Sequence, residues 1–202
     1  MSHLENIREL LNELKNCPAA DISKYFAPAS DLFPLLTKKE QNECAQTFYH
    51  WAEENAVREP LKFCYAKFLF ALNSFLCEQH ETALHLVTEA RSRFEEQNDR
   101  IGIGICASLM GGIYRTLGNI DLALKTLWES YSLLKQSGTY SHFLSACTCN
   151  MANIYLEMHN HDEALLMFKL TYEQCEKNND PFWIYYALHG LGKVYMLQHK
   201  YH

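Results

Sequence analysis

The chain has 202 residues, of which 48% belong to the hydrophobic set and 21% are charged, and its formal net charge is −6. The acidic balance argues against a generic nucleic-acid binder, because such proteins present a basic face to the phosphates. Only eight glycines and five prolines are present, and no stretch is rich in Gly, Pro or Ser. This composition argues against a long flexible linker and favours helices over sheets.

The amino-terminal residues 1–6 show no cationic stretch followed by an apolar run, and no segment approaches the ~20 apolar residues of a membrane span. We therefore expect a cytoplasmic protein without a membrane partner. Eight cysteines are dispersed within apolar helical patterns, which indicates reduced, buried thiols rather than a disulfide framework. They are Cys17, Cys44, Cys64, Cys77, Cys106, Cys147, Cys149 and Cys175.

The first 58 residues predict two capped helices joined by an irregular segment. Ser2 with Glu5, and Thr37 with Glu40, form two capping boxes, each placed before a helical apolar pattern. Between them, the prolines of the apolar stretch 25–36 predict a short, irregular helical segment. We interpret residues 1–58 as a helical cap, in which helix 38–56 is a candidate second half of a degenerate repeat.

From residue 59 onward the chain repeats itself at a nearly fixed interval. Small residues recur at spacings of 40, 41 and 40, and in the last three copies a tyrosine follows three positions later on the same helical face. The small residues are Ala71, Gly111, Ala152 and Gly192, and the tyrosines are Tyr114, Tyr155 and Tyr195.

Each copy also carries an alanine that is followed four residues later by a larger apolar residue. These pairs are Ala83 with Val87, Ala123 with Leu127, and Ala164 with Phe168. Small residues let two helices approach closely while the larger ones fill the neighbouring grooves, so two helices per copy explain the pattern. The predicted pairs are 61–77 with 80–97, 101–117 with 120–137, and 141–158 with 161–177, followed by a single helix at 181–198.

The segment 110–123, with Gly111, Tyr114, Gly118 and Ala123, resembles the tetratricopeptide repeat family, and 151–164 resembles it in the same register. The resemblance covers residues 60–202. The period of 40 to 41 exceeds the usual ~34 and is similar to the extended repeats of bacterial peptide-responsive regulators. It implies an all-α, right-handed superhelical solenoid of antiparallel helix pairs over residues 59–202, without a cofactor.

In this family the first helices of the pairs line a concave face that binds peptides. Two amides spaced by three residues can hydrogen-bond a peptide backbone, and two cations can hold a carboxylate. The expected binding residues are Arg115, Asn150, Asn153, Glu157, Tyr186, His189 and Lys193. The same helical phase adds to the lining Tyr65, Phe68, Leu72, Ile105, Ser108, Gly112, Cys149 and Met196. For each residue, the plain alternative is a solvated polar position on a helix surface.

The last predicted helix, 181–198, would expose an apolar face if no further helix covered it. Its residues Tyr185, Leu188 and Tyr195 are therefore candidates for an oligomer interface. The two explanations are a chain that continues past His202 with another repeat, and a homodimer that uses this face.

No catalytic or metal-binding constellation is evident in the sequence. The chain lacks a Gly-rich phosphate loop, a Gly-x-Ser-x-Gly elbow and a His-Glu-x-x-His motif, and His159 with His161 falls in a predicted turn. We expect a peptide- or protein-binding regulatory module rather than an enzyme. The family resemblance implies an output domain in the same chain, such as a nucleotide cyclase, phosphatase, kinase or transcription regulator. The alternative is a structural module that dimerises through its terminal helices.

Overall fold

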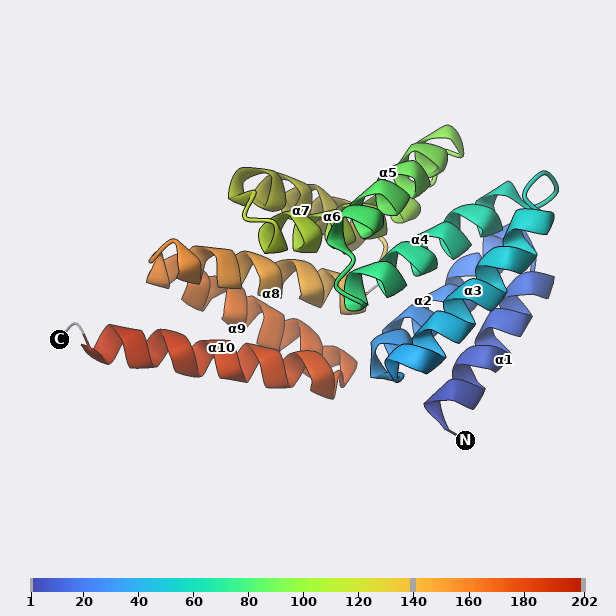
Figure 1. Cartoon of the computed structure of the whole chain (residues 1–202). Helices are drawn as coiled ribbons and strands as arrows, with labels where there is room; N and C mark the ends of the chain where they lie inside the picture. Colours follow the sequence, from blue (N-terminus) through green and yellow to red (C-terminus); the bar gives the residue numbers. More distant parts are fainter. Residues whose placement is uncertain (1, 139–140, 201–202) are drawn as a thin grey trace. The chain divides into compact units, whose positions relative to one another are not determined.

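A computed structural model of the protein describes residues 2–138 and 141–200, and all the regular structure within them is helical (Figure 1). Consecutive helices pack against one another in pairs, so the predicted all-α class is confirmed, whereas the right-handed winding stays a prediction. The helices are α1 His3–Asn16, α2 Ile22–Leu32, α3 Lys38–Glu54, α4 Pro60–Leu76, α5 His80–Glu96, α6 Arg100–Thr116, α7 Ile120–Lys135, α8 Ser141–Glu157, α9 His161–Asn178 and α10 Pro181–Lys200. Two short 3-10 turns, Ala19–Asp21 and Phe33–Leu35, flank α2.

Both predicted capping boxes are present. The side chain of Ser2 accepts a hydrogen bond from the Glu5 backbone, that of Thr37 accepts one from Glu40, and each glutamate reaches back to its cap. The segment between α1 and α3 is more regular than predicted, because α2 runs for 11 residues with Pro28 inside it. Burial of Phe26 and its neighbours on one face holds this helix together despite the missing proline amide.

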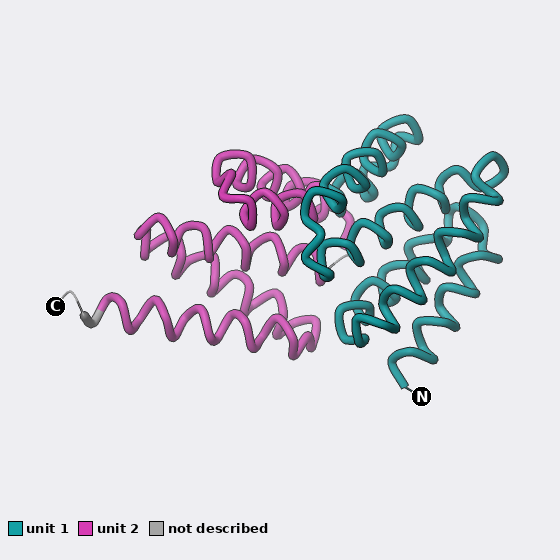
Figure 2. The backbone as a smooth tube through the Cα atoms, in the orientation of Figure 1, with its two compact units in different colours: residues 1–106 teal, residues 107–202 magenta. Residues whose placement is uncertain are grey.

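The chain divides into two compact units, residues 1–106 and 107–202 (Figure 2). The two units are defined by how closely their residues pack, and their boundary does not show where the repeats begin. The predicted limits of the cap (1–58) and of the repeats (59–202) therefore stay predictions.

The core of the first unit is built from large aromatic rings. The ring of Phe26 lies 4.6 Å from that of Tyr65 and 6.1 Å from that of Phe68, and Tyr65 meets Phe94 edge-on at 4.8 Å. Such rings bury a large apolar area and prefer these tilted and edge-on arrangements. The core thus ties α2, α4 and α5 together through side chains of similar size.

A buried lysine caps a helix in the same unit. Lys62 is only 2% exposed, and its Nζ donates a hydrogen bond of 3.0 Å to the carbonyl oxygen of Lys15, in the last turn of α1. A Glu59 carboxylate oxygen lies 3.4 Å from the same nitrogen. Lys62 therefore satisfies a helix-terminal carbonyl and is itself paired, as a buried charge requires.

The core of the second unit depends instead on small residues at fixed positions of the repeat. Ala123 and Ala164 are fully buried. A Cβ atom placed on Gly111 would lie 2.5 Å from the Leu127 side chain. These contacts confirm that the repeated small residues mark close approaches between neighbouring helices.

Hydroxyl and thiol groups complete this second core. The Cys147 thiol shares one hydrogen bond between the Ser108 and Ser130 hydroxyls, at 3.3 and 3.1 Å, and the Thr171 hydroxyl donates to Thr148 at 2.8 Å. Short polar side chains can therefore stay buried because each finds a partner on the next helix.

Candidate functional site

A polar cluster joins α6 and α8 in the second unit. Arg115 Nη2 lies 2.7 Å from Glu157 Oε1, and Arg115 Nη1 lies 3.5 Å from Asn150 Oδ1. The side chains of Arg115 and Glu157 are 30% and 50% exposed. An ion pair this exposed contributes only about 0–1 kcal/mol, so a ligand can exchange with one of its partners at small cost.

The two predicted amides of α8 offer opposite hydrogen-bonding groups. Asn153 Nδ2 donates to the carbonyl oxygen of Cys149 at 2.9 Å, which leaves its Oδ1 as an acceptor. Asn150 Oδ1 accepts from Arg115, which leaves its amide nitrogen as a donor. Both residues are half-buried. One donor and one acceptor, three residues apart on one helix, match the carbonyl and N–H of an extended peptide.

Arg115 has a further hydrogen-bond donor in the polar cluster. Its Nε atom is buried and has no hydrogen-bond partner within the described part of the chain. A buried donor without a partner costs free energy, and a ligand oxygen that reached it would recover that cost.

The three predicted residues on α10 are exposed but stand apart from this cluster. Tyr186 packs against Phe182 and Trp183, with ring centroids 4.9 and 5.6 Å away, and His189 stacks on Tyr185 at 6.1 Å. No hydrogen bond or ion pair among residues 141–200 links Tyr186, His189 or Lys193 to Asn150 or Glu157. The structure therefore brings together the residues of α6 and α8 and leaves those of α10 as a neighbouring aromatic and cationic surface.

The predicted lining of the first helices was wrong at seven positions. All seven are buried: Tyr65, Phe68, Leu72, Ile105, Ser108, Gly112 and Cys149. Tyr65 and Phe68 belong to the aromatic core, and Ser108 accepts the Cys147 hydrogen bond. Helical phase alone could not separate a groove-lining position from one covered by a neighbouring helix.

Sequence reasoning missed a cluster that anchors α10 to α8. His142 is buried, its Nδ1 accepts a 3.0 Å hydrogen bond from Trp183 Nε1, and it lies 3.3 Å from Asp180 Oδ2. Burial acts to raise the pKa of the Asp180 carboxyl, but the neighbouring His142 and hydrogen bonds from the Trp183 and Phe182 amides outweigh it. That pKa therefore lies below its ordinary value. Only the Asp180-Pro181 cap signalled this cluster in the sequence.

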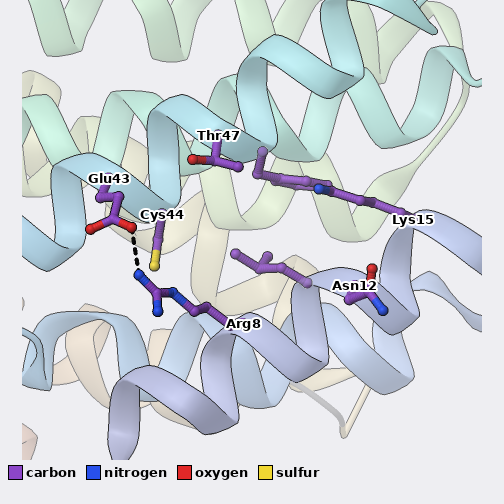
Figure 3. A pocket seen from close by; sticks show the side chains of 8 residues that line it. Arg8, Asn12, Lys15, Glu43, Cys44 and Thr47 are labelled. Atoms are coloured by element: carbon purple, nitrogen blue, oxygen red, sulfur yellow. Dashed lines mark hydrogen bonds and ion pairs between the residues drawn. The ribbon is translucent and has the colours of Figure 1, made fainter.

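The first unit has a shallow groove between α1 and α3, with a volume of about 330 Å³ (Figure 3). Arg8 on α1 points across it to Glu43 on α3, and the two side chains pair beside Cys44. The Lys15 ammonium lies 5.7 Å from the Trp51 ring. The opposite charges of Arg8 and Glu43 already balance each other, and no predicted site residue lies in this groove.

Cys64, Cys147 and Cys149 are poorly suited to nucleophilic chemistry. Burial raises the pKa of Cys64 and Cys147 to about 11 and that of Cys149 to about 12. Each is therefore a thiol near neutral pH, whereas the thiolate is the nucleophile and the metal ligand. His159 has a left-handed backbone, with a φ of 59°, in the turn before α9. Within the described residues, no group of three or more His, Cys, Asp or Glu side chains could hold a metal ion.

Comparison with known protein families identifies the same pattern of repeated helix pairs with small residues at their crossings. The tetratricopeptide repeat model matches residues 105–177, from within the first half of α6 to the last turn of α9. This segment is a tetratricopeptide repeat. Tetratricopeptide repeats bind protein or peptide partners in general, and the polar cluster lies on the first helices of this segment. No curated protein matches the chain.

No helix in the described part of the chain combines enough length with enough apolarity to cross a membrane.

Proposed function

We propose that the chain binds an extended segment of a partner protein on the first helices of its tetratricopeptide repeats, at the polar cluster of α6 and α8. The observation that carries this proposal is the donor and acceptor pair of Asn150 and Asn153, beside an arginine with a buried, unpartnered Nε. Amide pairs recognise the peptide backbone and therefore tolerate different side chains.

Charged groups around the pair add selectivity. A ligand carboxylate can replace Glu157 on Arg115 and gain two charge-assisted hydrogen bonds from the guanidinium. The exposed Lys193 and His189, with the ring of Tyr186, form a second contact surface for the same segment on α10. An acidic residue in the partner segment suits Arg115 and Lys193.

We propose binding rather than catalysis as the role of these residues. The raised pKa values of Cys147 and Cys149 support this, because a protonated thiol is a poor nucleophile. The free, mostly buried cysteines also support a cytoplasmic location, where thiols stay reduced. The similarity to extended repeats supports a regulatory or sensor role within a signalling protein whose output domain is a cyclase, phosphatase, kinase or transcription regulator.

The test begins with affinity capture by the chain and with mapping of the captured protein to a short segment. Isothermal titration of that segment should show weaker binding to Asn150→Ala and Asn153→Ala. Asn178→Ala is the matched control, because Asn178 is an exposed asparagine whose amide also bonds its own helix, at 2.8 Å from the Gln174 carbonyl. Equal affinity of all three variants would contradict the proposed site.

A second candidate function is self-association through α10. Tyr185, Leu188 and Tyr195 are 65%, 52% and 44% exposed, which is unusual for residues of this size on one helix. Sedimentation analysis over a range of concentrations tests it. A chain that stays monomeric at every concentration rules this function out.

A further inference from the structure

One stripe of α10 is apolar, exposed and set in a definite register of the repeat. Tyr185, Leu188, Gly192 and Tyr195 are spaced by three, four and three residues, so they lie on one face of the helix. We call this set the α10 stripe. All four residues are exposed.

The equivalent stripe of α8, 40 residues earlier, is covered by α9. It consists of Ser145, Thr148, Ala152 and Tyr155. Ser145 accepts a hydrogen bond of 3.2 Å from the Cys175 thiol, and Thr148 accepts the one from Thr171. Figure 1 shows α9 lying along α8. In the repeat, this register is therefore the place where a second helix packs on a first helix.

The space around Gly192 is a second, independent observation that points to the same packing position. A Cβ on Gly111, its equivalent in α6, would meet Leu127 of the second helix, and a Cβ on Gly190 would lie 2.2 Å from Phe168. A Cβ on Gly192 would meet nothing within 4 Å. Glycine within a helix costs stability relative to alanine, and no contact among the described residues makes it necessary at this position. The position leaves room for a large side chain supplied from outside.

We propose that the α10 stripe binds an amphipathic helix of a partner protein, which packs on α10 as α9 packs on α8. The large residues Tyr185 and Leu188 replace Ser145 and Thr148, so the partner helix has small residues opposite them. Over Gly192 it places Leu or Phe, as Leu127 lies over Gly111.

This size pattern distinguishes a partner helix from a second copy. A second copy offers only the same stripe, and a two-fold pairing centred on Gly192 sets glycine against glycine. That pairing leaves the space over Gly192 empty. It also places Leu188 against the large Tyr195 of the other copy, where the register of α8 and α9 places small residues.

The probe is a labelled peptide of residues 160–179, which is the α9 sequence with its caps. Its Phe168 is the large residue for Gly192, and Thr171 and Cys175 are the small residues for Leu188 and Tyr185. We expect fluorescence anisotropy, under reducing conditions, to show binding to the parent chain. Binding should weaken at least tenfold for the Gly192→Leu chain, and equally for a Phe168→Ala peptide with the parent chain.

Gly192→Leu should fold normally, because nothing in the described chain lies within 4 Å of the new Cβ and leucine favours helix; circular dichroism checks this. Lys169→Leu adds the same side chain to the exposed surface of α9 and should bind the peptide like the parent. The proposal is overturned if the parent does not bind the peptide, or if Gly192→Leu binds it equally well. It is also overturned if the parent forms a dimer by sedimentation that Gly192→Leu abolishes, since the occupant is then a second copy. None of these outcomes tests peptide binding at Asn150 and Asn153, which is the proposed function.

Discussion

The two units solve the same packing problem with different side chains. In the first unit, Phe26, Tyr65 and Phe94 interlock as large rings. In the second unit, Gly111 and Ala164 let helices approach closely while a larger residue, such as Leu127, fills the groove. Small residues at a fixed register leave a readable repeat in the sequence, whereas interlocked rings do not. The first unit also carries a copy of the repeated small residues, Ala71 and Ala83, both fully buried, and the family match covers residues 105–177.

Buried polar groups differ between the units in the same way. The first unit buries Lys62, a full charge that caps a helix end. The second unit buries Cys147 and Thr171, neutral groups that bond across neighbouring helices. Removing a partner should therefore cost more in the first unit, because an unpaired charge is more expensive to bury than an unpaired hydroxyl.

The largest expected effect is a cavity in the aromatic core. Phe68 is fully buried, so Phe68→Ala should destabilise the first unit by ~3–5 kcal/mol. Hydrogen exchange of the α4 amides, compared with the parent, measures this loss. Unchanged protection of α4 would show that the aromatic cluster does not hold the unit together.

The buried lysine should give the next largest effect. Lys62→Ala removes the ammonium group that donates to the Lys15 carbonyl and should cost ~2–3 kcal/mol in urea unfolding. Lys62→Met keeps most of the apolar stem and separates the loss of packing from the loss of the ammonium group. Lys67→Ala is a comparison, because the Glu89 partner of Lys67 is 44% exposed and water can replace the lysine. A larger loss for Lys67→Ala than for Lys62→Ala would contradict this ranking.

Overpacking tests the small residues of the second unit. Ala164→Leu and Ala123→Leu should each destabilise the chain by ~1–3 kcal/mol, because both sites are fully buried. Lys125→Leu, at an exposed position of α7, should leave stability nearly unchanged. Urea unfolding of Ala164→Leu that matched the parent would remove the support for the repeat register.

The smallest effect concerns acid stability at the start of α10. The folded state lowers the pKa of Asp180 below its ordinary value of 3.8, so the ionised carboxylate stabilises the fold above that pH. This contribution is lost as the pH falls through the folded pKa. Asp180→Asn should cost about 1 kcal/mol at pH 7, and the difference from the parent should shrink to zero in acid. A difference that stayed constant from pH 7 to pH 2 would exclude the carboxylate as its cause.

Much of the fold follows from local signals in the sequence. Ser2 and Thr37 begin their helices as predicted, and α4 to α10 lie within a few residues of the expected ranges. Capping residues act on their immediate neighbours and small residues recur in register, so both can be read without tertiary information. Pro28 misled the prediction for α2, because burial of that helix outweighs the local cost of a proline.

The candidate site was less predictable than the fold. Arg115 and Glu157 are 42 residues apart, and their pairing depends on how α6 packs against α8. The contact of His142 with Trp183 likewise joins residues 41 positions apart. Burial of Ile105 and Ser108 depends on neighbouring helices that helical phase does not include. Long-range packing, rather than residue type, therefore decides which polar residues remain available to a ligand.

The most direct test of the proposed binding site is the salt dependence of affinity for the mapped partner segment. Asn150→Ala and Asn153→Ala should each weaken binding by ~1–3 kcal/mol at every salt concentration, because they lose neutral hydrogen bonds to the peptide backbone. The effect of Lys193→Ala should shrink as salt rises, since exposed charges are screened over ~8–10 Å near physiological ionic strength. The account is contradicted if all three variants bind like the parent while substitutions of Tyr185, Leu188 or Tyr195 abolish association.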